Sequence, residues 1–186
     1  MEKYTFDPAL ITLDEFYMLT RDKKLIPSRI TLQDRMENRF VKLREAGISH
    51  LGALIKALKS RELIANLSAS TGIPESYLIL LKREAGSYLA SPYPLSDIPG
   101  VPYEYTEVLK SINIRHTRDF FEQVQTRDDQ AQTAQRTGIP VARLKEIFAL
   151  TDLSRITGVG PVFARVVYQA GITSVKAFAK TDAESH

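Results

Sequence analysis

Apolar residues recur at spacings of three and four positions along much of this 186-residue chain. Such spacing places them on one face of an α-helix. Clear examples are Leu51, Leu54, Ile55 and Leu58 in one segment, and Leu144, Ile147 and Phe148 in another. No segment alternates apolar and polar residues convincingly enough to indicate a half-buried β-strand. The pattern therefore predicts an all-α fold.

Polar residues mark where several of these helices begin. Thr12, Ser49, Ser60, Thr126 and Thr173 each stand just before a helical segment. A side-chain oxygen in that position can accept a hydrogen bond from a free backbone amide of the first turn. Residues 31–46 carry an apolar stripe without any glycine or proline inside it, so the pattern predicts one long helix there.

Short sequence elements repeat in register. Residues 70–74 (STGIP) recur as 136–140 (RTGIP), and 47–50 (GISH) recur as 113–116 (NIRH) at the same offset. Residues 95–102 (LSDIPGVP) align with 153–160 (LSRITGVG). Matched repeats of roughly sixty residues indicate an array of similar units. We expect N-terminal helices with a degenerate hairpin half over 1–46, a first repeat unit over 47–112, and a second over 113–186, with 83–94 as a linker.

The second repeat contains a glycine turn within residues 151–171 (TDLSRITGVGPVFARVVYQAG). Two glycines around one apolar residue let the backbone turn sharply, and Pro161 suits the first turn of the helix that follows. The start of that helix presents free amides and a partial positive charge to an anion. The segment therefore predicts a contact with an anion such as a phosphate group through Gly158, Val159, Gly160, Val162, Arg165 and Arg155.

The first repeat lacks the features that favour an anion. Pro102 stands where the second repeat has Gly160, and proline has no amide hydrogen to donate. Residues 95–107 carry three acids and no base, whereas the basic excess lies over 136–165. We expect the first turn to be structural and the second to bind.

Composition narrows the chemistry. The net charge of +3 permits a polyanionic partner, and the absence of cysteine excludes disulfides and thiolate chemistry. Histidine occurs only at positions 50, 116 and 186, and no catalytic motif is present. Asp182 follows the glycine turn as in some glycosylases, but its surroundings would not bury it. We expect no catalytic residue, metal ion or cofactor. Without a signal peptide or membrane span, we expect a cytoplasmic protein with no membrane partner.

Residues 151–171 resemble the helix-hairpin-helix motif, which binds nucleic-acid backbone without reading sequence. From Leu25 onward the chain resembles a bacterial domain-of-unknown-function family with tandem helix-hairpin-helix units. The resemblance rests on LIPSR at 25–29, both TGIP elements, DIPGVP at 97–102, and the DLSRI and GVGP segments that follow. It implies tandem hairpin repeats with short connecting helices, a nucleic-acid role and a shortened C-terminus, and it supplies no activity.

Two functions remain open at this point. The first is non-enzymatic, sequence-nonspecific binding of nucleic-acid backbone, with double-stranded DNA favoured as the partner. The second is an α-helical interaction or scaffold module, in which the hairpins serve only for packing and a protein partner or a second copy docks on them. A third class, a glycosylase-like enzyme, is rejected on the grounds given for Asp182.

Overall fold

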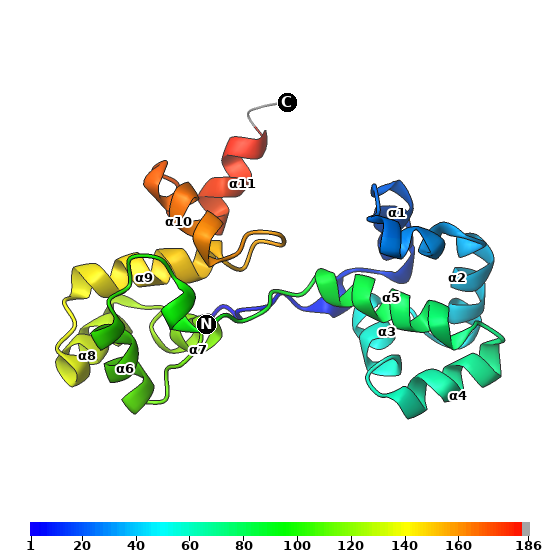
Figure 1. Cartoon of the computed structure of the whole chain (residues 1–186), viewed down its shortest axis with the longest axis horizontal. Coiled ribbons are helices and arrows are strands. Elements are labelled where there is room, and N and C mark those ends of the chain that lie inside the picture. The colour runs from blue at the N-terminus through cyan, green and yellow to red at the C-terminus, as the bar shows by residue number, and fades with distance from the viewer. Residues whose placement is uncertain (184–186) are drawn as a thin grey trace. The chain divides into compact units, whose positions relative to one another are not determined.

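The computed structural model describes residues 1–183, and within them the chain forms helices and no β-strand. The all-α prediction is confirmed. The chain divides into two compact units, which we call the amino-terminal unit (residues 7–89) and the carboxy-terminal unit (residues 1–6 together with the chain from Ala90 onward). Each unit is described by itself, with the helix labels of Figure 1.

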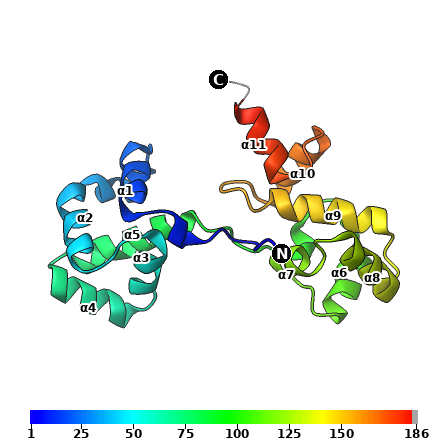
Figure 2. The same ribbon diagram turned by 180° about the vertical axis from the view of Figure 1, so that it is seen from behind.

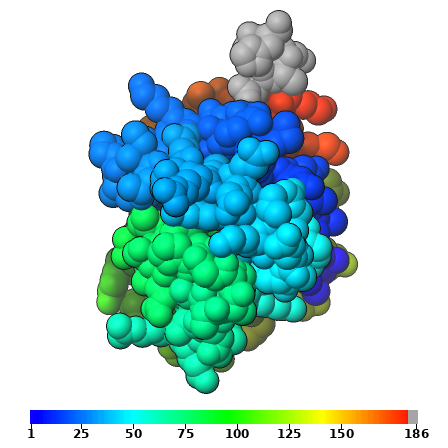
Figure 3. All heavy atoms as spheres, turned by 90° about the vertical axis from the view of Figure 1, so that its right-hand side faces the viewer, coloured from blue at the N-terminus to red at the C-terminus, as the bar shows by residue number. Residues whose placement is uncertain are grey.

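The amino-terminal unit packs its helices around one apolar core. Phe16, Phe40, Leu51 and Leu81 are among the fully buried side chains of this core. Figure 3 shows this unit from one side, with the residues of α1 and α2 above those of α5. Its elements are η1 (Pro8–Leu10), α1 (Leu13–Asp22), η2 (Pro27–Gln33), α2 (Met36–Glu45), α3 (Leu51–Ala57), α4 (Arg61–Thr71) and α5 (Glu75–Ser87).

The carboxy-terminal unit has one main core and a smaller apolar cluster. Leu109, Phe120 and Leu144 lie in the main core, and Val159 and Ala164 lie in the smaller cluster between α9 and α10. Figure 2 shows the same elements from behind, with α10 and α11 next to one another on the far side of α9 from α6–α8. The elements are η3 (Leu95–Asp97), α6 (Tyr103–Ser111), α7 (Thr117–Gln123), α8 (Arg127–Thr137), α9 (Val141–Leu153), α10 (Pro161–Gln169) and α11 (Val175–Ala183).

The repeated sequence elements adopt the same local geometry. The second residue after the end of α2, α6 and α10 has a positive φ in all three places: 82° at Gly47, 66° at Asn113 and 90° at Gly171. The amide of the following isoleucine then donates to a carbonyl inside the helix, over 3.1, 3.0 and 3.3 Å respectively. This hydrogen bond satisfies a carbonyl that the helix end leaves free. The sequence repeats are therefore also repeats of turn geometry.

Helix caps follow the sequence prediction in part. Thr12, Ser60 and Thr126 accept hydrogen bonds from first-turn amides, as predicted. Two predicted caps are wrong by one residue. His50, rather than Ser49, caps α3 through Nδ1, and the hydroxyl of Ser174 accepts from Ala177 at the start of α11. Thr173 and Ser174 are equally suitable hydroxyl caps, so composition could not separate them, whereas His50 is not among the usual N-cap residues and Ser49 was the better choice from sequence alone.

The prediction of one long helix over residues 31–46 is wrong. The chain breaks between η2 and α2 at Arg35, which has a left-handed φ of 47°. Arg39 stabilises the break, because it donates to the carbonyl of Asp34 at 2.8 Å and stacks on the ring of Tyr77 at 4.0 Å. Leu32 and Met36 remain buried on either side of the break. The spacing of apolar residues therefore fits both a continuous helix and a broken one, and could not distinguish them.

The compact units do not coincide with the expected repeat segments 1–46, 47–112 and 113–186. The boundary between the units lies at residues 89 and 90. The expected linker at 83–94 is wrong in its first part, because residues 83–87 are the last residues of α5 and include buried Glu84 and Ala85. Residues 1–6 belong to the carboxy-terminal unit, although they precede α1. The repeat boundaries mark where similar sequence elements recur. The compact units instead mark which helices pack against one another and bury their apolar faces.

A buried carboxylate distinguishes the amino-terminal unit. The side chain of Glu84 on α5 is fully buried and accepts from Lys23 at 2.8 Å and from Arg29 at 2.7 Å. Burial alone raises the pKa of Glu84, but the two hydrogen bonds outweigh it and hold the pKa below the ordinary value of 4.5. Arg29, part of the LIPSR element, therefore has a structural partner.

This pairing makes the stability of the amino-terminal unit depend on pH. Because the folded pKa lies below the unfolded one, Glu84 contributes stability above about pH 4.5, and the contribution is lost as the pH falls through the folded pKa. We expect the difference in unfolding free energy between wild type and Glu84→Gln to shrink from pH 7 to pH 3 in urea titrations. Exposed Glu62 is the control, since Glu62→Gln should change little at any pH. A difference that does not vary with pH would contradict the assignment.

Candidate nucleic-acid interface

The second glycine turn joins α9 to α10 through residues 154–160. The amide of Val159 donates to the carbonyl of Ile156 at 2.8 Å, which closes the turn. Gly158 has a φ of 83°, a conformation that side chains with a Cβ rarely adopt. Gly160 is the N-cap of α10 with an ordinary φ of −85°, and Pro161 occupies the first helical position, as predicted.

The start of α10 offers unpaired backbone amides. Among the described residues, no acceptor is recorded for the amides of Gly160, Val162 and Phe163. The first turn of α10 carries no acidic residue, and no side chain caps it. The amide of Val159, by contrast, is already used inside the turn, and its side chain is buried. Of the predicted turn contacts, the geometry leaves Gly158, Gly160 and Val162 available and adds Phe163.

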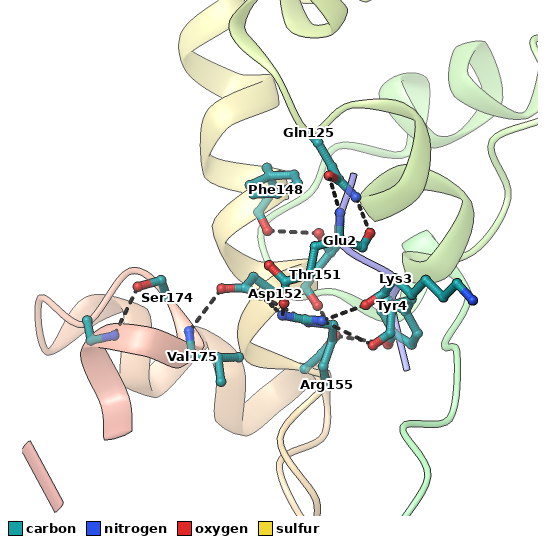
Figure 4. Close-up of polar contacts among 12 residues, drawn as sticks. Glu2, Lys3, Tyr4, Gln125, Phe148, Thr151, Asp152, Arg155, Ser174 and Val175 are labelled. Atoms are coloured by element: carbon teal, nitrogen blue, oxygen red, sulfur yellow. Dashed lines mark hydrogen bonds and ion pairs between the residues drawn. The ribbon is translucent and has the colours of Figure 1, made fainter. Parts of the chain in front are cut away.

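Arg155 lies inside the unit. Its side chain is only 12% exposed and forms ion pairs with Asp152 and Glu2, each at 2.7 Å. The same guanidinium group donates to the carbonyls of Lys3 and Tyr4 at 2.9 and 3.2 Å, as Figure 4 shows. It also lies over the ring of Phe121 at 4.1 Å. All of its donors therefore serve the fold.

The Arg155 cluster joins three distant parts of the chain. Asp152 accepts from Arg155 through one oxygen and from the amide of Val175, at the start of α11, through the other at 2.9 Å. Tyr4 is buried and its hydroxyl lies 2.8 Å from the hydroxyl of Thr117. The N-terminal segment, the end of α9 and the start of α11 are thus held together at one point.

Arg165 is also engaged within the unit. Its Nη1 pairs with Glu146 on α9 at 2.6 Å, and its Nε donates to the carbonyl of Pro99 at 2.7 Å. Glu146 also pairs with Arg143, whose other nitrogen donates to the carbonyl of Gly100 at 3.0 Å. The Nη2 of Arg165 is buried without a recorded partner among the described residues. Arg165 therefore connects α10 to the first turn.

The two arginines predicted as phosphate contacts are thus both committed to internal contacts. The sequence could not show this, because the partners Lys3 and Pro99 lie far from Arg155 and Arg165 along the chain. A basic residue beside a turn gives the same local pattern whether it faces solvent or a carbonyl. In the structure both side chains therefore point into the unit, and not outward toward a phosphate as predicted.

The first turn has the same closing hydrogen bond and a different helix start. Val101 donates to Ile98 at 3.2 Å and Gly100 has a φ of 81°, which matches Val159 and Gly158. At the N-cap of α6, however, stands Pro102, with Glu104 in the first turn. The carbonyls of this turn receive hydrogen bonds from Arg143 and Arg165. These contacts agree with the expected structural role.

The outer face of α10 is apolar and open to solvent. Val162 is 67% exposed, and Phe163 and Val166 are each 53% exposed. The opposite face, with Ala164 and Val167, is buried against α9. The helix therefore has two apolar faces, of which the unit covers one.

The described residues show no further chemical centre. In this part of the chain, no three His, Asp or Glu residues gather in a way that could hold a metal ion. None of the helices in residues 1–183 is both long and apolar enough to cross a bilayer. The side chain of Asp182 and the residue His186 lie outside the part that the structure describes.

Residues 99–185 match a protein family described as a domain of unknown function (DUF4332). The match includes Gly100 of the first turn and the whole of the second turn with α10, and it assigns no activity to them. No curated protein matches the chain. No solved structure matches it either.

Proposed function

We propose that residues 151–171 form a helix-hairpin-helix unit that binds the phosphate backbone of nucleic acid, with double-stranded DNA as the favoured partner. The observation that carries the proposal is the uncapped start of α10, where the amides of Gly160, Val162 and Phe163 have no recorded acceptor among the described residues. Backbone amides at a helix start attract an anion through both hydrogen bonding and the helix dipole. No base is read, so binding is independent of sequence.

The internal contacts of Arg155 and Arg165 set the strength of this binding. Because both guanidinium groups are paired inside the unit, backbone amides make most of the contact with the phosphate. Amides carry no net charge, so binding releases few counterions from the nucleic acid. We therefore expect a dissociation constant in the non-specific range, roughly 10⁻⁴ to 10⁻⁶ M at physiological salt. The log–log salt slope should be shallow, roughly −1 to −2 on duplex DNA.

Fluorescence anisotropy across a salt series tests the proposal. The labelled probes are a random-sequence duplex, its single strand and an RNA duplex, each measured from 50 to 300 mM salt. We expect similar affinity for unrelated duplex sequences and weakening with salt. No binding to any of the three probes at millimolar protein would overturn the proposal.

A second candidate function has its own support. The open apolar face of α10, formed by Val162, Phe163 and Val166, favours an α-helical interaction module. Such a module would bind a protein through apolar contacts and would not need to bind nucleic acid. Absence of binding to all three nucleic-acid probes would therefore favour this second candidate.

A further inference from the structure

Arg155 receives most of its hydrogen-bond acceptors from outside the family domain that carries it. The matched residues 99–185 include Arg155 and Asp152 but not residues 1–6, which we call the N-terminal segment. Among the matched residues that the structure describes, Asp152 is the one recorded acceptor of Arg155. The other three acceptors all lie in the N-terminal segment and are visible in Figure 4: the carboxylate of Glu2 and the carbonyls of Lys3 and Tyr4.

The contact between Glu2 and Arg155 has the chemistry of a phosphate contact. A carboxylate and a phosphate both accept hydrogen bonds from a guanidinium group through negatively charged oxygens. Glu2 accepts from the Nη2 of Arg155 at 2.7 Å, and its side chain is 69% exposed. The side chain of Asp152, on the same nitrogen, is only 10% exposed. Glu2 is therefore the partner that an anion from solution can replace.

The backbone of Glu2 is held in place without its carboxylate. Its amide donates to the Oε1 of Gln125 at 3.0 Å, and its carbonyl accepts from the Nε2 of the same side chain. Tyr4, two residues further on, is buried. These contacts keep the Glu2 carboxylate beside Arg155 at a high effective concentration. They also leave the N-terminal segment docked when the Glu2 side chain is replaced.

The N-terminal segment and the start of α10 border the same part of the unit. Arg155 stands on the second glycine turn, which ends at the open amides of α10. Tyr93 connects the two places. Its carbonyl accepts from the amide of Thr117, whose hydroxyl lies 2.8 Å from the hydroxyl of Tyr4. The hydroxyl of Tyr93 lies 3.8 Å from the position that a Cβ on Gly160 would occupy.

We propose that Glu2 is an intramolecular competitor of phosphate, and that Arg155 becomes a second phosphate contact when the Glu2 carboxylate is displaced. The inference rests on the proposed function, because it concerns how the same turn binds nucleic-acid backbone. An exposed ion pair shifts an equilibrium by about fivefold at most. Glu2 therefore weakens the binding of nucleic acid without preventing it.

Fluorescence anisotropy of the full chain with a random-sequence DNA duplex, from 50 to 300 mM salt, gives the first test. We expect Glu2→Ala to bind about threefold to fivefold more tightly than wild type at 100 mM salt, because Arg155 is then open to phosphate. The log–log salt slope should steepen by up to about 0.9, the value for one further phosphate neutralised. The matched control is Glu122→Ala on α7, which removes the same charge from an exposed position of the same unit and should behave like wild type.

A second measurement needs no nucleic acid. The nuclear magnetic resonance signal of the Arg155 Nε–H group is followed while inorganic phosphate is added at constant ionic strength. This signal should shift in Glu2→Ala and stay nearly unchanged in wild type and in Glu122→Ala, where Glu2 occupies the guanidinium group. Circular dichroism should show the same helix content in all three proteins.

Two results overturn the inference. One is that Glu2→Ala binds the duplex no more tightly than Glu122→Ala while both bind, in which case the proposed function stands. The other is an Arg155 signal in Glu2→Ala that does not respond to phosphate. A phosphate response in Glu2→Ala without duplex binding by any of the three proteins would support the competition at Arg155 and overturn the proposed function instead.

Discussion

Replacing Arg155 with alanine is expected to lower the unfolding free energy of the carboxy-terminal unit by about 3 kcal/mol. Removing one partner of a buried ion pair leaves the other charge uncompensated, which costs roughly 3–5 kcal/mol in well-buried cases. Asp152 is that partner, and the carbonyls of Lys3 and Tyr4 lose their donor as well. Urea unfolding followed by far-ultraviolet circular dichroism measures the change.

Two further variants make this prediction specific. Arg155→Lys keeps the charge but loses the planar fork that reaches several acceptors at once, so it should recover only part of the stability. Arg115→Ala removes an exposed arginine of the same unit and should cost less than about 0.5 kcal/mol. If Arg155→Ala were as mild as Arg115→Ala, the Arg155 cluster would not be holding the unit together.

Replacing Arg165 with alanine should destabilise the same unit by about 2 kcal/mol. Hydrogen bonds to charged groups contribute roughly 1.5–3 kcal/mol each, and Arg165 makes one to Glu146 and one to the carbonyl of Pro99. Its buried Nη2 has no recorded partner among the described residues, which costs roughly 1–3 kcal/mol and offsets part of that gain. The first turn would lose its connection to α10. Thermal and urea unfolding of the variant measure the loss.

Arg143 provides the matched comparison, because it pairs with the same carboxylate of Glu146. Its side chain is 38% exposed, against 14% for Arg165, so solvent screens it more. Arg143→Ala should therefore cost about 1 kcal/mol or less. A larger loss for Arg143→Ala than for Arg165→Ala would contradict the structural role given to Arg165.

The sequence predicted features that depend on neighbouring residues. The caps at Thr12, Ser60 and Thr126 follow from a side chain and amides within three positions, so they can be recognised without a structure. The sharp turn at Gly158 is predictable for the same reason, because only glycine adopts its φ of 83° without strain. Helix spacing similarly predicts the all-α fold.

Features that depend on distant residues were missed. Arg35 adopts a left-handed conformation that nothing in its neighbourhood favours, and contacts of Arg39 with Tyr77 accompany it. The placement of residues 1–6 in the carboxy-terminal unit depends on Arg155, about 150 positions away. The orientation of a charged side chain next to a turn also depends on distant residues. The candidate site depends on that orientation at Arg155 and Arg165, so the sequence alone could not describe the site.

The most direct test of the phosphate-binding proposal compares wild type with Gly160→Pro in duplex-DNA anisotropy at 100 mM salt. The φ of −85° at Gly160 and its unpaired amide allow proline there, so the variant should fold and lose one donor. Since a hydrogen bond to a charged group is worth roughly 1.5 kcal/mol, we predict about tenfold weaker binding. Equal binding by wild type and a folded Gly160→Pro variant would contradict the proposal that the start of α10 holds a phosphate.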